Sequence, residues 1–212
     1  MRMSVRALTL LLAVLVCAGG TVSATILVPV DLTELVRAAD TVAYGRVIDV
    51  SAVRVDGRYS DTIVTLASSA VLKGEPRSEV VFRVAGGETG RYRTVILGAP
   101  VLREGDEVVV FLAGAAPQIP HLVGFSQGIL PILRDDQQRA VVLAPALAVA
   151  GAAAQPIVRG QGQRRVLTLA GFADEVRGLL GAAASAQASA ARASAPSHAP
   201  AYAAAGRSQA RR

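Results

Sequence analysis

The stretch EVVVFLAG, Glu107 to Gly114, is the most strongly apolar β-strand pattern in the sequence, and the turn motif REGD leads into it. Val and Phe favour pleated, buried surfaces, so this segment is predicted to be a strand. Similar segments lie on both sides of it, separated by Gly, Pro and Asp: residues 41–55, 61–74, 78–84, 91–98, 121–133 and 139–145. A turn is predicted at Asp56-Gly57, between the first two of these segments. Short strands at this spacing indicate an antiparallel barrel or sandwich.

Two helices are predicted beside these strands. Asp31 lies three residues before Glu34, which is typical of a capped helix start, and apolar residues at helical spacing then predict a helix over 32–39. Further along the chain, Thr168 is positioned to cap a helix that has one apolar face. We expect this second helix to dock on the strands.

The first 24 residues have the features of an export signal. Arg2 and Arg6 precede an apolar run that is too short to span a bilayer, and small residues favour cleavage after Ala24. The mature chain then begins at Thr25, and no later run is long enough to form a transmembrane segment. The predicted location is therefore the periplasm or the surrounding medium.

Composition divides the mature chain into three parts. Residues 25–145 hold the predicted barrel, and residues 146–182 hold a loop and the docking helix. Residues 183–212 are mainly Ala, Ser, Pro and Arg with almost nothing to bury, so we predict a disordered tail.

Charge and cysteine content limit the possible partners and cross-links. The formal net charge is +6, but the basic excess lies in the signal and the tail, so the folded part is predicted to be neutral. With few aromatic residues as well, nucleic acid is not an expected partner. The only cysteine, Cys17, lies in the signal after Val16, where a lipoprotein signal would place a small residue. The mature chain can form no disulfide, so burial must stabilise it.

The motif GFSQG, Gly124 to Gly128, has the spacing of a hydrolase nucleophile elbow around Ser126. An elbow requires a strand that runs directly into a helix, whereas ILPIL after this motif continues as a strand. His121 is the only histidine outside the tail, and it lies in a Pro-rich loop. We therefore interpret Ser126 as structural and its flanking glycines as a bulge or close strand crossing.

Other small-ligand sites receive little support from the sequence. The loop GGETGR, Gly86 to Arg91, lacks the pattern of a phosphate-binding loop and is predicted to be a hairpin loop. One ordered histidine and no cysteine do not favour a zinc site. Asp135 and Asp136 are predicted to form an exposed turn without calcium-loop spacing. No cofactor and no metal site are predicted.

Several segments over residues 25–133 occur in the order of a known fold. They are Val28-Pro29, AADTVAYGRVI (38–48), TIVTLASSAVLKG (62–74), EVVFRV (79–84), REGDEVVVFLAG (103–114) and HLVGFSQGILPI (121–132). Together they resemble the netrin-like fold and, within it, the tissue inhibitors of metalloproteinases. The resemblance implies an OB-type, five-stranded antiparallel barrel.

The resemblance also implies a site at the mature N-terminus. Thr25 would bind the zinc of a metalloprotease through its α-amino nitrogen and its carbonyl oxygen. Ile26, Leu27, Val28 and Pro29 would continue as an extended ridge into the protease cleft. The family begins with a disulfide-bonded cysteine, and this chain has none, so Pro29 and the helix after it would have to supply the rigidity.

These observations favour an exported, non-enzymatic module that binds another macromolecule. A protein partner is expected, and the resemblance implies that this partner is a zinc metalloprotease. On an OB-type barrel, the loops 86–93 and 115–122 are the expected contact loops. A structural protein of the cell envelope, with its basic tail on anionic surfaces, is the alternative. A serine hydrolase using Ser126 is a remote alternative.

Overall fold

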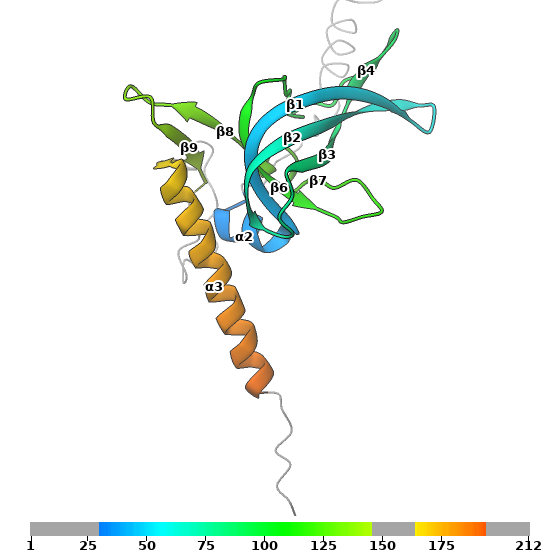
Figure 1. The fold of residues 1–212 in the computed structure, drawn as a ribbon. Coiled ribbons are helices and arrows are strands. Elements are labelled where there is room, and N and C mark those ends of the chain that lie inside the picture. Colours follow the sequence, from blue (N-terminus) through cyan, green and yellow to red (C-terminus); the bar gives the residue numbers. More distant parts are fainter. Residues whose placement is uncertain (1–29, 146–163, 194–212) are drawn as a thin grey trace, which may run out of the picture.

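The structure, a computed structural model, describes residues 30–145 and 164–193 (Figure 1). Its elements in chain order are α2 (Leu32–Ala38), β1 (Thr41–Val55), β2 (Tyr59–Lys73), β3 (Glu79–Ala85), β4 (Gly87–Thr89), β5 (Tyr92–Thr94), β6 (Glu107–Ala113), β7 (His121–Leu122), the 3₁₀ helix η1 (Phe125–Gly128), β8 (Ile129–Arg134), β9 (Ala140–Ala144), β10 (Arg165–Thr168) and α3 (Leu169–Ala193). The protein is mainly β, with a short helix before the strands and a long helix after them, as predicted. No helix in these two ranges is long and apolar enough to cross a membrane.

The two longest strands, β1 and β2, form a hairpin at the predicted turn. Asp56 and Gly57 have φ values of +48° and +66°, and the N–H of Arg58 donates to the carbonyl of Val55 over 3.1 Å. Positive φ at both central residues is the geometry of a type I′ turn, whose twist suits a hairpin. The hairpin explains why the Asp-Gly pair separates two β patterns.

Hydrogen-bonded strand pairs form one large sheet centred on β6. One edge of β6 pairs with β1, and the other edge pairs first with β8 and then with β7. Successive pairings lead from β1 through β2, β3, β7 and β6 back to β1. All of these pairings are antiparallel except β3–β7, which is a single parallel bridge between Arg83 and His121. Strands β8, β9 and β10 extend the sheet from β6.

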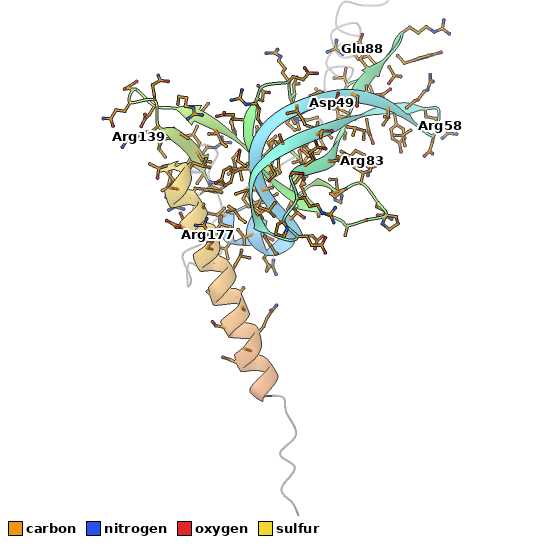
Figure 2. All side chains as sticks on the ribbon, viewed as in Figure 1. Asp49, Arg58, Arg83, Glu88, Arg139 and Arg177 are labelled. Atoms are coloured by element: carbon orange, nitrogen blue, oxygen red, sulfur yellow. The ribbon has the colours of Figure 1, made fainter. Side chains whose placement is uncertain are left out.

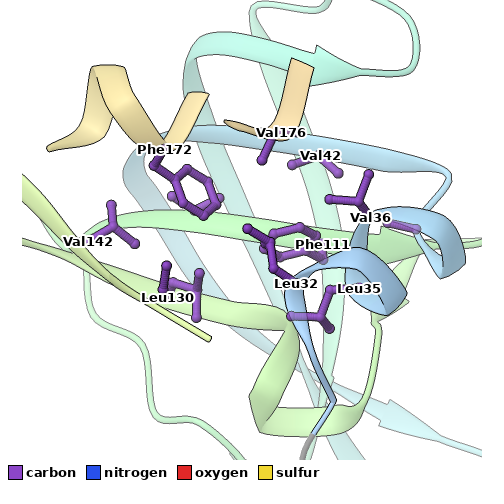
Figure 3. Close-up of a cluster of buried hydrophobic side chains, with 12 residues drawn as sticks. Leu32, Leu35, Val36, Val42, Phe111, Leu130, Val142, Phe172 and Val176 are labelled. Atoms are coloured by element: carbon purple, nitrogen blue, oxygen red, sulfur yellow. The ribbon is translucent and has the colours of Figure 1, made fainter. Parts of the chain in front are cut away.

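Strand β6 is buried on both faces because it separates two apolar clusters. Val108, Val110 and Leu112 pack with residues of β1, β2 and β3 in the first cluster. Val109 and Phe111 point the other way, into a second cluster built with α2, α3, β8 and β9 (Figure 3). Side chains alternate across a strand, so the run VVVFL supplies both clusters at once.

Helix α3 covers the second cluster. The ring of Phe172 meets the ring of Phe111 edge to face, with centroids 6.4 Å apart and planes at 88°. Val176 is also fully buried, and Leu179 and Leu180 pack at the margin. An aromatic pair in this geometry contributes about 0.5–1.5 kcal/mol beyond its area burial. The predicted docking of this helix is confirmed.

Both ends of the short helix α2 are capped. The carboxylate of Asp31 accepts a 2.8 Å hydrogen bond from the N–H of Glu34, as the sequence predicted. At the other end, the ammonium group of Lys73 donates to the carbonyls of Val36 and Ala39 at 2.8 and 2.5 Å. A cation also suits the negative end of a helix dipole. Lys73, the only lysine in the sequence, therefore ties α2 to the end of β2.

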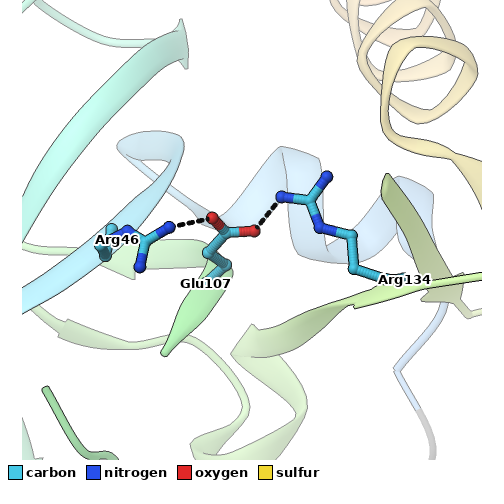
Figure 4. Close-up of polar contacts among 3 residues, drawn as sticks. All are labelled: Arg46, Glu107 and Arg134. Carbon is cyan, nitrogen blue, oxygen red and sulfur yellow. Dashed lines mark hydrogen bonds and ion pairs between the residues drawn. The ribbon is translucent and has the colours of Figure 1, made fainter. Parts of the chain in front are cut away.

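A charged network joins β6 to both of its neighbours at the start of the strand (Figure 4). Glu107 accepts from Arg46 of β1 at 2.7 Å and from Arg134 of β8 at 2.6 Å. The two arginines are largely exposed, so each pair contributes only about 0–1 kcal/mol. The network links the three strands at this point, and the ladder hydrogen bonds set their register.

Two predicted strands are shorter or more broken than expected. Only Tyr92–Thr94 of the segment 91–98 is a strand, because its partner is the three-residue β4. The segment 121–133 is divided into β7 and β8 by η1. Strand β10 was not predicted. It has only four residues directly before a helix, and so short a pattern does not reveal that this segment pairs with β9.

The prediction that disorder starts at residue 183 is wrong for residues 183–193, which continue α3 and project beyond the sheet (Figure 1). Ala is the strongest helix former, so this segment can be helical without burial. The hydroxyls of Ser185 and Ser189 also donate to carbonyls four residues earlier. The rest of the predicted tail, 194–212, lies outside the described residues.

The contacts of Lys73 lead to a stability prediction. Lys73→Met should lower the free energy of unfolding by about 1–3 kcal/mol, because partly buried helix carbonyls lose their donor. Arg58→Met, at the tip of the β1–β2 hairpin, should change it by less than about 0.5 kcal/mol. Urea unfolding followed by circular dichroism measures both, and equal effects would contradict the proposed tie.

Candidate functional site

The predicted site residues Thr25, Ile26, Leu27, Val28 and Pro29 lie outside the described residues. The structure does describe the point where they join the fold. The N–H of Val30 donates to the side-chain oxygen of Gln127 over 2.7 Å, across 97 positions of sequence. The side chain of Val30 packs against the second cluster and toward Gly124. Val30, the first described residue after these five, is therefore held at η1.

The turn η1 has this position because of its two glycines. Gly124 and Phe125 both have positive φ, +59° and +62°, and the N–H of Gln127 closes the turn on the carbonyl of Gly124 at 3.2 Å. A side chain at Gly128 would overlap the backbone of Val123. The close crossing predicted for these glycines is confirmed at Gly128, and the crossing places Gln127 beside the start of the described chain.

Ser126 does not lie in a nucleophile elbow. It occupies the 3₁₀ turn η1, and the chain then enters strand β8 and not a helix. The flanking strands β7 and β8 both run antiparallel to β6, whereas the elbow belongs to a strand–turn–helix unit. This sharp turn connects β7 to β8, the two strands that pair in succession with the same edge of β6.

A loop whose first four residues were predicted to belong to a strand carries the two most exposed large apolar side chains among the described residues, Leu97 and Val101. Residues 95–101, the apolar loop, follow β5, and the exposed fractions of Val95, Leu97 and Val101 are 65%, 93% and 83%. Gly98 in this loop faces Phe125, and a methyl group on its α-carbon would lie 3.7 Å from the phenyl ring. The turn η1 thus lies beside both the apolar loop and the residue that follows the predicted site. Contiguous exposed apolar residues of this kind mark interaction surfaces.

The expected contact loop 86–93 is the β4–β5 hairpin, and cross-links to β2 hold it in place. The hydroxyl of Thr94 accepts from the N–H of Ser60 at 2.8 Å, and the hydroxyl of Thr62 donates to the carbonyl of Gly86 at 2.7 Å. The guanidinium of Arg54 lies 4.1 Å above the ring of Tyr92. These contacts fix the β4–β5 hairpin against β2, and the apolar loop begins directly after β5.

A small cavity of about 300 Å³ separates η1 from β3. Apolar walls come from Pro100, Leu122 and Phe125, and the nearly buried carboxylate of Asp61 lies 3.5 Å from the guanidinium of Arg83. The charged side chains of Asp61 and Arg83, which line this cavity, are therefore paired with each other. Within residues 30–145 and 164–193, no three His, Cys, Asp or Glu residues are grouped so that they could hold a metal ion.

The acidic pair at residues 135 and 136 lies in the β8–β9 turn, as predicted. The carboxylate of Asp135 accepts from the N–H of Arg139 at 2.8 Å and from the N–H of Gln137 at 2.9 Å. The Arg139 N–H, together with the Arg139 side chain, holds the pKa of Asp135 below its usual value. Asp135 thus closes a hairpin.

Comparisons of this chain with protein-family models, curated proteins and solved structures find no match. Its function is therefore inferred from the geometry of the N-terminal attachment, η1 and the apolar loop. Sequence reasoning identified the motif of η1 but missed the apolar loop, since VIL after Arg93-Thr94 has the pattern of a buried strand. The Leu97-Gly98-Ala99-Pro100 continuation, with Gly and Pro close together, was the available signal for a loop.

Gly128 provides a direct test of the role of η1. Gly128→Ala should lower the free energy of unfolding by about 1–3 kcal/mol, because a methyl group would press on the Val123 backbone. Gly178→Ala, in an open position on α3, should instead raise it by about 0.5–1 kcal/mol. Denaturant unfolding compares the two; a harmless Gly128→Ala would show that η1 tolerates rearrangement.

Proposed function

We propose that this protein is an exported, non-enzymatic module that binds a zinc metalloprotease and inhibits it. Its contact surface consists of the N-terminal segment 25–29 and the apolar loop 95–101. The observation that carries the proposal is the position of η1, which contacts Val30 through Gln127 and lies beside the apolar loop through Phe125. An extended N-terminal segment and an exposed apolar loop would then meet the partner side by side.

The strand pairings support an OB-type, netrin-like barrel as the scaffold. An OB fold is a five-stranded, partly open Greek-key barrel. Here five strands, β1, β2, β3, β7 and β6, pair in a ring, and the single parallel bridge makes the ring weakest between β3 and β7. Fold alone does not identify a ligand, so the proposal depends on the surface beside η1.

The proposed inhibition uses the α-amino group of Thr25 as a zinc ligand. An amine binds a metal only after it loses its proton, and an α-amine has a reference pKa of about 7.7–8.0, well below that of lysine. The mature chain has one other amine, Lys73, and its ammonium group is bound to α2. The terminus is therefore the amine suited to ligation.

Anchoring at Val30 limits the entropic cost of binding without a disulfide. Each residue that becomes ordered costs about 1–2 kcal/mol of backbone entropy. Since Val30 is already held by Gln127, the ordering cost of binding is limited to at most the five residues 25–29, and Pro29 has a restricted φ. The exposed apolar loop offers further burial that can offset this cost.

The chelating terminus can be tested with two forms of the mature protein. The form that begins at Thr25 should slow cleavage by a zinc metalloprotease, whereas a form with one additional N-terminal alanine should not, because its α-amine is displaced from the metal. Inhibition should strengthen as pH rises toward about 8, where the amine loses its proton. Equal inhibition by both forms, or none by either against a panel of such proteases, would rule out this mechanism.

The apolar loop has a separate test. Leu97→Asp should weaken inhibition by at least about tenfold, because a central apolar contact residue often contributes 2 kcal/mol or more. Stability should not change, since this side chain is almost fully exposed. Val166→Asp, at an exposed position on β10, is the matched control and should leave inhibition unchanged. Loss of inhibition in both variants would point to a general charge effect and not to the loop.

A further inference from the structure

One edge of β3 is unpaired along half of its length. The N–H of Arg83 donates across this edge to the carbonyl of Pro120 at 2.8 Å. Because the backbone groups of alternate residues point to the same edge, those of Val81 and Glu79 also point outward. In the part of the chain that the structure describes, β3 is paired on this edge only at Arg83. The N–H and C=O groups of Val81 are thus available to an added strand.

A groove of about 610 Å³ runs along this open edge. The start of β3 forms one wall, and the loop 114–120 between β6 and β7 forms the other. Val81 and Ile119 expose apolar side chains at the two walls. An open edge next to a groove is the arrangement that binds extended peptides by strand addition, with backbone hydrogen bonds for affinity and side-chain pockets for specificity.

The groove is acidic. Asp40, Glu75 and Glu79 line it together with a single basic residue, Arg77. Asp40 accepts from the N–H of Gly114 at 2.8 Å, and Arg77 is paired with Glu75 at 2.7 Å. Glu79 has no ion-pair or hydrogen-bond partner among residues 30–145 and 164–193. An extended segment with basic and small side chains fits this surface best.

We propose that the C-terminal segment 194–212 of this chain occupies the groove as an added strand on β3. This segment contains Arg207, Arg211 and Arg212, no acidic residue, and mostly small side chains. It therefore has the charge that the groove lacks. Tethering makes the binding intramolecular, which raises the effective concentration of a weakly binding peptide.

The segment is long enough to reach the groove. Helix α3 contacts α2 and β2, and the groove includes Gly74 and Glu75 just after β2. From Leu180, at the margin of the core, to the end of α3 at Ala193 is about 20 Å at 1.5 Å per residue. The 19 residues that follow can span about 63 Å when extended. A return to the groove needs only part of that length.

A second copy of the protein fits the edge less well. Strand β7 already occupies the edge at Arg83, so a partner strand could pair only around Glu79 and Val81. A two-fold pairing over so short a stretch would bring the Glu79 carboxylates of the two copies close together, directly opposite each other when it is centred on Glu79, and like charges opposite each other are destabilising. The tail segment meets no such repulsion.

Amide hydrogen exchange at Val81, followed by NMR, tests the proposal. In the full mature chain the Val81 amide should exchange at least about tenfold more slowly than in a chain that ends at Ala193. Adding a synthetic peptide of residues 194–212 to the shortened chain should restore protection. The amide of Phe82, which faces β2, should be protected in both and serves as the internal control.

Two charge variants of the full chain control for an indirect effect of removing residues 194–212. Glu79→Lys should abolish the difference at Val81, whereas Glu88→Lys, on the distant β4–β5 hairpin, should retain it (Figure 2). Protection should also weaken at high salt. Equal exchange of Val81 in the full and shortened chains would overturn the proposal. Protection that depends on protein concentration would overturn it in favour of pairing between copies.

Discussion

The burial of β6 on both faces is the constraint on which the rest of the structure depends. A strand that is apolar on both sides needs a cover on each, and the chain supplies the β1–β2–β3 sheet on one side and the two helices on the other. Both edges of β6 must also be paired, because its buried N–H and C=O groups cannot reach water. The positions of β1, β7, β8, α2 and α3 all follow from these two requirements.

The same constraint creates the candidate site. To pair with β6 along its whole second edge, the chain must pass from β7 to β8, and it does so through the turn η1. Gly128 permits the close backbone contact, and the turn presents Gln127 to Val30 and Phe125 to the apolar loop. A structural necessity of the sheet thus brings together the attachment of the N-terminal segment and the most exposed apolar residues. The open edge of β3 has a related origin, since β7 is too short to cover it.

Much of the fold was predictable because local patterns agree with it. The Asp31 cap, the Asp56-Gly57 turn, the alternation in β3 and the helical apolar face of α3 each depend on neighbouring residues alone. The failures have a common cause, since they concern segments whose state depends on distant partners. Val95-Ile96-Leu97 is not a strand because β4, the partner of β5, ends after three residues. Strand β10 forms because it can pair with the edge of β9. Residues 183–193 are an exception, where helix propensity prevailed over the lack of burial.

The sequence by itself determined the mainly β character, the two helices and the structural role of the GFSQG glycines. These properties follow from side-chain chemistry and spacing within a few residues. Only the tertiary structure decided that Val30 is held by Gln127, that the loop 95–101 lies beside η1, and that half of β3 has an open edge. Contacts across 97 positions depend on how strands are ordered in the sheet, and local spacing carries no information about that order.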